Sequence, residues 1–104
     1  MTRIVFDGLT MQAVGHAGYG AFGQDVVCAG MSTLFVTAAE MILDMEEGGL
    51  VADKVLRLEP GNVCMGVRPA EAGREKAEWL FRTLETGCRI LAESYPDNVC
   101  IETA

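Results

Sequence analysis

The chain has 104 residues, of which 50% are hydrophobic and 22% charged, a composition typical of a single globular domain rather than a disordered chain. Its net charge of −7 disfavours direct binding to the phosphate backbone of nucleic acids and favours a basic partner. We see no N-terminal leader and no apolar run near the roughly 20 residues that cross a membrane, so we expect a cytoplasmic protein without membrane contact.

The N-terminal part of the chain predicts two strands and a loop. A strand over residues 3–6 is rich in β-forming side chains and stops at Asp7-Gly8. A second strand is expected over residues 11–16. Four glycines then fall between residues 15 and 23, which predicts an irregular connection.

The first helix is predicted to begin at Val26. Asp25 precedes it as a plausible N-cap, and Gly48-Gly49 ends it. Its apolar residues recur with the period of an α-helix and mark one buried face: Val27, Met31, Leu34, Phe35, Ala38, Ile42 and Met45.

The second half of the chain predicts two more strands, a second helix and a last short strand. Strands over 54–59 and 63–68 flank the turn at residues 60–62, and a second helix carries an apolar stripe from Ala77 to Tyr95. A short strand over 99–102 ends the chain.

The elements therefore follow the order ββαββαβ. We predict one α+β domain over residues 1–104, with two layers: two helices packed on one mostly antiparallel sheet. The short, hairpin-like connections argue against a doubly wound parallel sheet.

The four cysteines do not form a metal-binding pattern. Cys28, Cys64, Cys88 and Cys100 include no C-x-x-C pair, and the chain has one histidine, so we expect no metal. The last three fall in apolar patterns and are expected as small core residues with free thiols.

The glycine-rich loop has three possible interpretations. Residues 18–23 match G-x-G-x-x-G, the fingerprint of dinucleotide-binding loops, yet Gly23 precedes the helix cap and the chain is too short for the usual two-half domain. The loop of a non-catalytic adaptor or binding module is a second interpretation.

The third interpretation is cysteine chemistry. Cys28 falls in the first helical turn and His16 ends the preceding strand, so the imidazole is expected within reach of the thiol. A helix N-terminus and a nearby imidazolium favour a thiolate, and first-turn amides can stabilise an oxyanion. A packed thiol and a structural histidine remain the alternative.

Residues 15–32 resemble the signature of the ribosomal-processing cysteine protease family, Prp. The signature is carried by Gly15-His16-Ala17, then Gly23-x-Asp25-x-Val27-Cys28-Ala29, then Ser32. The resemblance extends over essentially all 104 residues, although Gly20 and Gly30 stand where the family more often has alanine.

The resemblance implies a cysteine endopeptidase without a cofactor. Family members remove an N-terminal extension from large-subunit ribosomal protein number twenty-seven and look like homodimers. It implies that Cys28 is the nucleophile and His16 the base. The remaining site residues would be supporting ones, Gly15, Asp25 and Ser32, and those of the substrate loop, Gly18, Tyr19, Gly20, Phe22 and Gly23. Gly15 would leave space for the imidazole. A ribosome-assembly adaptor is the non-catalytic alternative.

Overall fold

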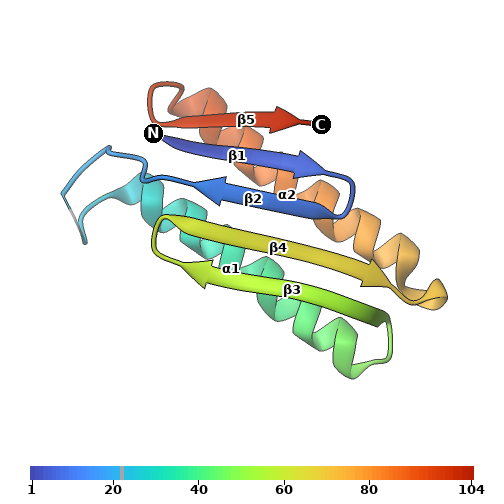
Figure 1. Ribbon diagram of the computed structural model, residues 1–104. Helices are drawn as coiled ribbons and strands as arrows, with labels where there is room; N and C mark the ends of the chain where they lie inside the picture. Colours follow the sequence, from blue (N-terminus) through green and yellow to red (C-terminus); the bar gives the residue numbers. More distant parts are fainter. Residues whose placement is uncertain (22) are drawn as a thin grey trace.

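The computed structural model describes residues 1–21 and 23–104 as a two-layer α+β domain, with two helices on one face of a five-stranded sheet (Figure 1). The predicted order ββαββαβ is confirmed. The elements are β1 (Thr2–Asp7), β2 (Thr10–Val14), α1 (Val26–Glu47), β3 (Val51–Glu59), β4 (Asn62–Pro69), a 3₁₀ turn (Glu71–Gly73), α2 (Arg74–Ser94) and β5 (Val99–Thr103).

The sheet is mostly antiparallel, as predicted. Its strand order is β3-β4-β2-β1-β5, and the pair β1–β5 is parallel whereas the other three pairs are antiparallel. The strands β3 and β5 therefore form the two edges of the sheet (Figure 1).

Two predicted boundaries were wrong. The second strand ends at Val14 rather than at residue 16, because Gly15 adopts a φ of +100° that no extended strand accommodates. The third strand begins at Val51, three residues early, across an irregular register between Val51 and Asp53.

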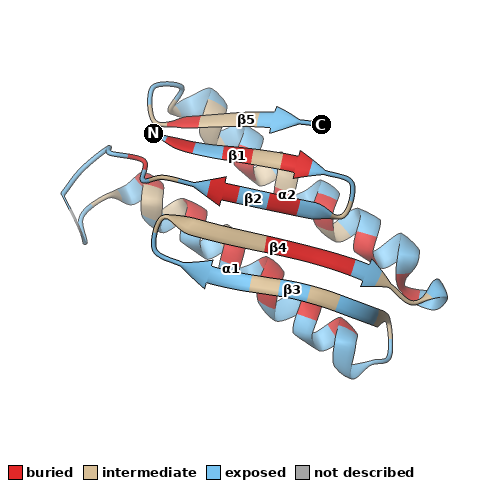
Figure 2. Cartoon of the chain, in the orientation of Figure 1, coloured by how far each residue is buried: buried red, intermediate tan, exposed pale blue. Residues whose placement is uncertain are grey.

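The core lies between the sheet and the two helices (Figure 2). The predicted face of α1 is buried apart from Leu34, which is partly buried. The two helices approach through two glycine–leucine pairs. A Cβ on Gly30 would lie 3.5 Å from the Leu91 side chain, and a Cβ on Gly87 would lie 2.8 Å from that of Leu34.

Two expectations about apolar residues need correction. By length and composition alone, α1 is long and apolar enough to cross a membrane, so it was wrong to expect no such run. Seven residues of α1 are buried in the domain core, whereas Val26, Val36, Met41 and Leu43 of the same helix are exposed. Cys88 is buried as expected, whereas Cys64 and Cys100 are only half-buried. Their register partners, Gln12 and Arg3, place them on the sheet face away from the helices.

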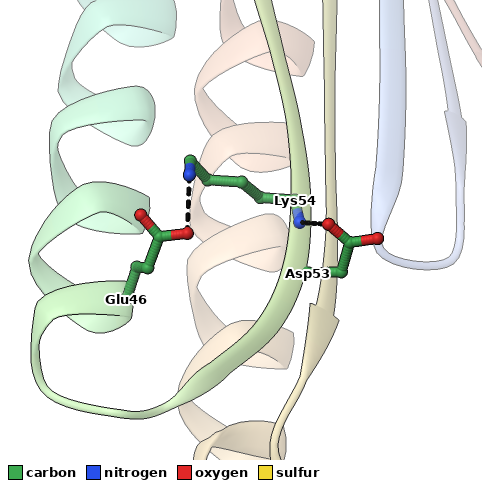
Figure 3. A network of polar contacts seen from close by, with 3 residues as sticks. All are labelled: Glu46, Asp53 and Lys54. Carbon is green, nitrogen blue, oxygen red and sulfur yellow. Dashed lines mark hydrogen bonds and ion pairs between the residues drawn. The ribbon is translucent and has the colours of Figure 1, made fainter.

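An ion pair joins β3 to the end of α1 (Figure 3). The last turn of α1 contains no basic residue, although cations stabilise helix C-termini. Lys54 of β3 brings a positive charge to this end of the helix, because its ammonium donates to the Glu46 carboxylate. The Asp53 carboxylate accepts the backbone N–H of Lys54 at 2.8 Å, which occupies one peptide group on this edge strand.

Candidate active site

His16 is held by its two neighbours in the chain. The Gly15 N–H donates to the Gly61 carbonyl at 2.9 Å, and the Asn98 side-chain amide donates to the Ala17 carbonyl at 2.9 Å. Ala17 is buried whereas His16 itself is exposed. The backbone thus presents the imidazole to solvent from a fixed position.

The imidazole lies against Gly61, in the turn between β3 and β4. A Cβ at Gly61 would lie 2.8 Å from the His16 Nε2, and the φ of Gly61 is +72°. Sequence reasoning assigned Gly61 only to a turn. In the structure, Val14 of β2 pairs with Asn62 of β4, so the residues that follow Val14 lie next to Gly61. The sequence alone does not reveal this strand register.

Gly15 also has a structural task that the resemblance does not imply. A Cβ there would collide with the carbonyl oxygen of Met1, and its φ is positive. The glycine therefore lets the N-terminus pack against this segment, and the absence of a side chain at Gly61 leaves further space beside the imidazole.

Asp25 is the N-cap of α1, as predicted. Its backbone is extended, with φ −82° and ψ 102°, and its Oδ1 accepts the N–H groups of Val27 and Cys28, both at 3.0 Å. Cys28 is half-buried in the first turn. The cap thus fixes the backbone that carries the thiol.

The second oxygen of Asp25 binds the loop. Oδ2 accepts the N–H of Tyr19 at 2.9 Å and that of Gly20 at 3.3 Å. The hydrogen bond from the Cys28 backbone, with smaller ones from Gly20 and Tyr19, lowers the pKa of Asp25. One carboxylate therefore ties the glycine-rich loop to the start of α1.

This arrangement changes two expectations. The N–H groups of Val27 and Cys28 are occupied by Asp25, and the Ala29 N–H donates to the Asp25 carbonyl at 3.0 Å. It was therefore wrong to expect these amides as free oxyanion donors. The dinucleotide interpretation fails as well, because a carboxylate of the protein occupies the amides that a phosphate would bind.

The loop also contacts Tyr95, the residue that follows α2. The rings of Tyr19 and Tyr95 meet edge to face, with centroids 5.2 Å apart. Gly18 and Gly23 have positive φ values of +69° and +82°. Phe22, the other predicted aromatic of the loop, lies outside the described residues. Sequence reasoning placed Tyr95 only in a helical stripe and so missed this contact.

The two residues of the predicted catalytic pair, His16 and Cys28, are not joined by a hydrogen bond. Within residues 1–21 and 23–104, no hydrogen bond links the His16 imidazole to the Cys28 thiol or to Asp25. Ser32 is exposed, one turn after Cys28. The described part of the chain also contains no cluster of three metal-ligating side chains.

Comparisons with known proteins agree on one family. The family model described as cysteine protease Prp matches residues 1–100. Two strains of Staphylococcus aureus, Mu50 and NCTC 8325, have a ribosomal processing cysteine protease Prp that is 23% identical over 100 residues, covering 95% of this chain and 83% of the relative.

Solved structures share the fold over the whole chain. Crystal structures of the S. aureus protease Prp with a covalently linked product peptide and with a substrate peptide give TM-scores of 0.78 and 0.74, at 19% and 17% identity, and cover 100% of both chains. A Streptococcus mutans protein gives 0.67 at 24% identity, covering 99% of this chain and 93% of that one.

Proposed function

The chain belongs to the Prp family of cysteine proteases, and we propose that it removes the N-terminal extension of large-subunit ribosomal protein number twenty-seven by Cys–His acyl transfer. The observation that carries this proposal is the position of Cys28, half-buried in a helical turn that Asp25 caps and ties to the loop. The relatives named above are ribosomal processing proteases, which supports the substrate class.

The proposed reaction uses two side chains. The His16 imidazole takes the proton of the Cys28 thiol, and the sulfur attacks the scissile carbonyl. The tetrahedral intermediate collapses as the imidazolium protonates the leaving amine. His16 then activates a water that hydrolyses the thioester and restores the thiol.

The approach of His16 to Cys28 is assigned to substrate binding. Catalytic hydrogen bonds often form only in the complex with substrate. The exposed imidazole rests on Gly61 rather than on a polar partner, so leaving that position breaks no hydrogen bond among the described residues. The oxyanion donors are assigned to groups other than the amides that Asp25 occupies.

The partner and the assembly follow from charge. A chain with net charge −7 attracts a basic ribosomal protein electrostatically, and the proposal places both in the cytoplasm.

We also propose a homodimer. Residues 26–39 of α1 carry no charge, and Val26 and Val36 are 60% and 50% exposed, so two acidic copies can meet there with little repulsion.

The test is incubation with synthetic peptides covering the N-termini of the host's ribosomal proteins, read by mass spectrometry. We expect one cut, in the peptide of protein number twenty-seven, and none with the Cys28→Ala variant. Binding without cleavage by the unmodified protein supports the adaptor alternative and overturns the protease proposal.

A further inference from the structure

The outer edge of β3 carries peptide groups that point away from the sheet. The Val67 N–H of β4 donates to the Leu9 carbonyl at 3.0 Å, on the side of β2, and Lys54 lies opposite Val67 in the register. Because successive residues of an antiparallel strand alternate between its two sides, the peptide groups of Lys54 also point away from β4. Leu56 and Leu58 share this orientation.

One end of this edge is closed and the other is open. The Asp53 carboxylate occupies the N–H of Lys54, and the Lys54 side chain reaches across to α1 (Figure 3). No side chain among the described residues accepts the N–H of Leu56 or Leu58. The open run from residue 55 to residue 59 is about 17 Å long, at roughly 3.4 Å per residue.

The open run leads to the catalytic histidine. It ends at Glu59, one residue before the turn in which Gly61 contacts the His16 imidazole. Val55 and Leu58 are 55% and 39% exposed and flank the edge on its two faces. Exposed edge strands usually carry protection against pairing. Among the described residues, the only outward amide of β3 that a side chain occupies is that of Lys54, at the end distant from His16.

We propose that this edge binds an extended segment of the substrate as an additional strand; the inference rests on the proposed protease function. The peptide groups of Leu56 and Leu58 pair with alternate residues of the substrate, and Val55 and Leu58 contact its apolar side chains. Arg57 pairs with Glu59 at 4.0 Å, so the edge adds little net charge. The occupied Lys54 amide stops pairing at the far end and directs the peptide toward His16.

The test measures peptide affinity in the Cys28→Ala background, so that binding is read without turnover. The peptide that the unmodified enzyme cuts is N-methylated at one residue at a time. We expect a weakening of about tenfold at every second residue of one stretch and little change at the residues between them. A scan without this alternation overturns the proposal while cleavage by the unmodified enzyme still supports the protease function.

Three protein variants locate the edge. Leu58→Pro removes an outward N–H and is tolerated on an edge strand, and it should weaken binding about tenfold and abolish the alternation. Leu58→Ala keeps the N–H and should keep the alternation. Thr103→Pro is the matched control on β5, where the Ala104 N–H faces β1 and that of Thr103 faces outward.

Each remaining outcome is decisive. Loss of affinity in Thr103→Pro rather than in Leu58→Pro overturns the assignment to β3. A change of sedimentation in Leu58→Pro, without a change in peptide affinity, shows that a second copy occupies this edge instead. If Leu58→Pro fails to fold, the scan with methylated peptides still decides between docking and no docking.

Discussion

The two helices α1 and α2 lie on the same face of the sheet and have nearly equal lengths, 22 and 21 residues, yet their exposed parts differ. Helix α1 starts with a side-chain cap, whereas α2 starts at Gly73 without one. The exposed side of α2 carries charges at regular intervals, but α1 has none before Glu40. Packing on a sheet requires neither the loop-binding cap nor the uncharged face, which is consistent with the roles proposed for them in the active site and the dimer.

The cysteines show the same contrast. Each helix carries one, Cys28 on α1 and Cys88 on α2. Burial, with a smaller contribution from Glu85, raises the pKa of the Cys88 thiol to about 12. Cys28 is only half-buried and sits at the capped end of its helix.

The largest expected effect is the loss of cleavage in Cys28→Ala, by about a thousandfold or more, because the proposed nucleophile is removed. The unfolding free energy should change little. Cys88→Ala should show the reverse, with near-normal cleavage and a loss of stability of about 1 kcal/mol from the cavity. Peptide cleavage assays and urea unfolding measure both effects.

Two controls make this contrast sharper. His16→Ala should lose cleavage as fully as Cys28→Ala because the proposed base is removed, and it should keep the fold because the imidazole is exposed. Limiting iodoacetamide should label Cys28 first and Cys88 last. Preferential labelling of Cys64, Cys88 or Cys100 in the folded protein counts against Cys28 as the nucleophile.

The second effect concerns the helix starts. Asp25→Ala should slow cleavage by about tenfold or more, because it frees the loop and removes the cap from the turn that carries Cys28. It should also lower the melting temperature. Glu75→Ala, in the first turn of α2, should change both much less, since the start of that helix has no side-chain cap hydrogen bond to lose.

The pH dependence follows from the direction of the Asp25 shift. The pKa of Asp25 is lower in the folded protein than its ordinary value of 3.8. The carboxylate therefore contributes its full stabilisation at pH values above 3.8, and this contribution is lost as the pH falls through the lower pKa of the folded state. The difference in melting temperature between the unmodified protein and Asp25→Ala should therefore shrink below pH 3.8. A difference that persists there contradicts the role of the ionised carboxylate.

The contrast also separates what the sequence predicts from what it does not. Local patterns predicted the elements, the cap and the buried face of α1, because the helical period and capping chemistry act over a few residues. The contacts of His16 with Gly61 and of Tyr19 with Tyr95 join residues more than forty positions apart, and they depend on sheet register and loop placement. No local signal carries that information.

The third effect concerns the outer faces. Val36→Glu should shift a dimer toward the 11.2 kDa monomer, because it places like charges at the two copies' uncharged face. Thr83→Glu puts the same charge on the exposed side of α2 and should leave the assembly unchanged. Sedimentation at micromolar concentration measures both, and a monomeric unmodified protein rejects the dimer proposal.

The smallest effect is expected at the glycines between the helices. Gly30→Ala should stabilise the protein by about 0.5–1 kcal/mol, since alanine lowers the entropic cost of helix formation and its Cβ would meet Leu91 at an ordinary distance of 3.5 Å. Gly87→Ala should gain less, because its Cβ would lie 2.8 Å from Leu34 and would force that side chain to move. Urea unfolding of the two variants measures the difference. Because Gly30 lies two residues after Cys28, cleavage is measured with the same samples: unchanged kcat in a stabilised Gly30→Ala shows that the first turn needs no glycine for catalysis. A loss of stability in Gly30→Ala, larger than in Gly87→Ala, would mean that the helices approach more closely at Leu91 than at Leu34, the opposite of the arrangement described here.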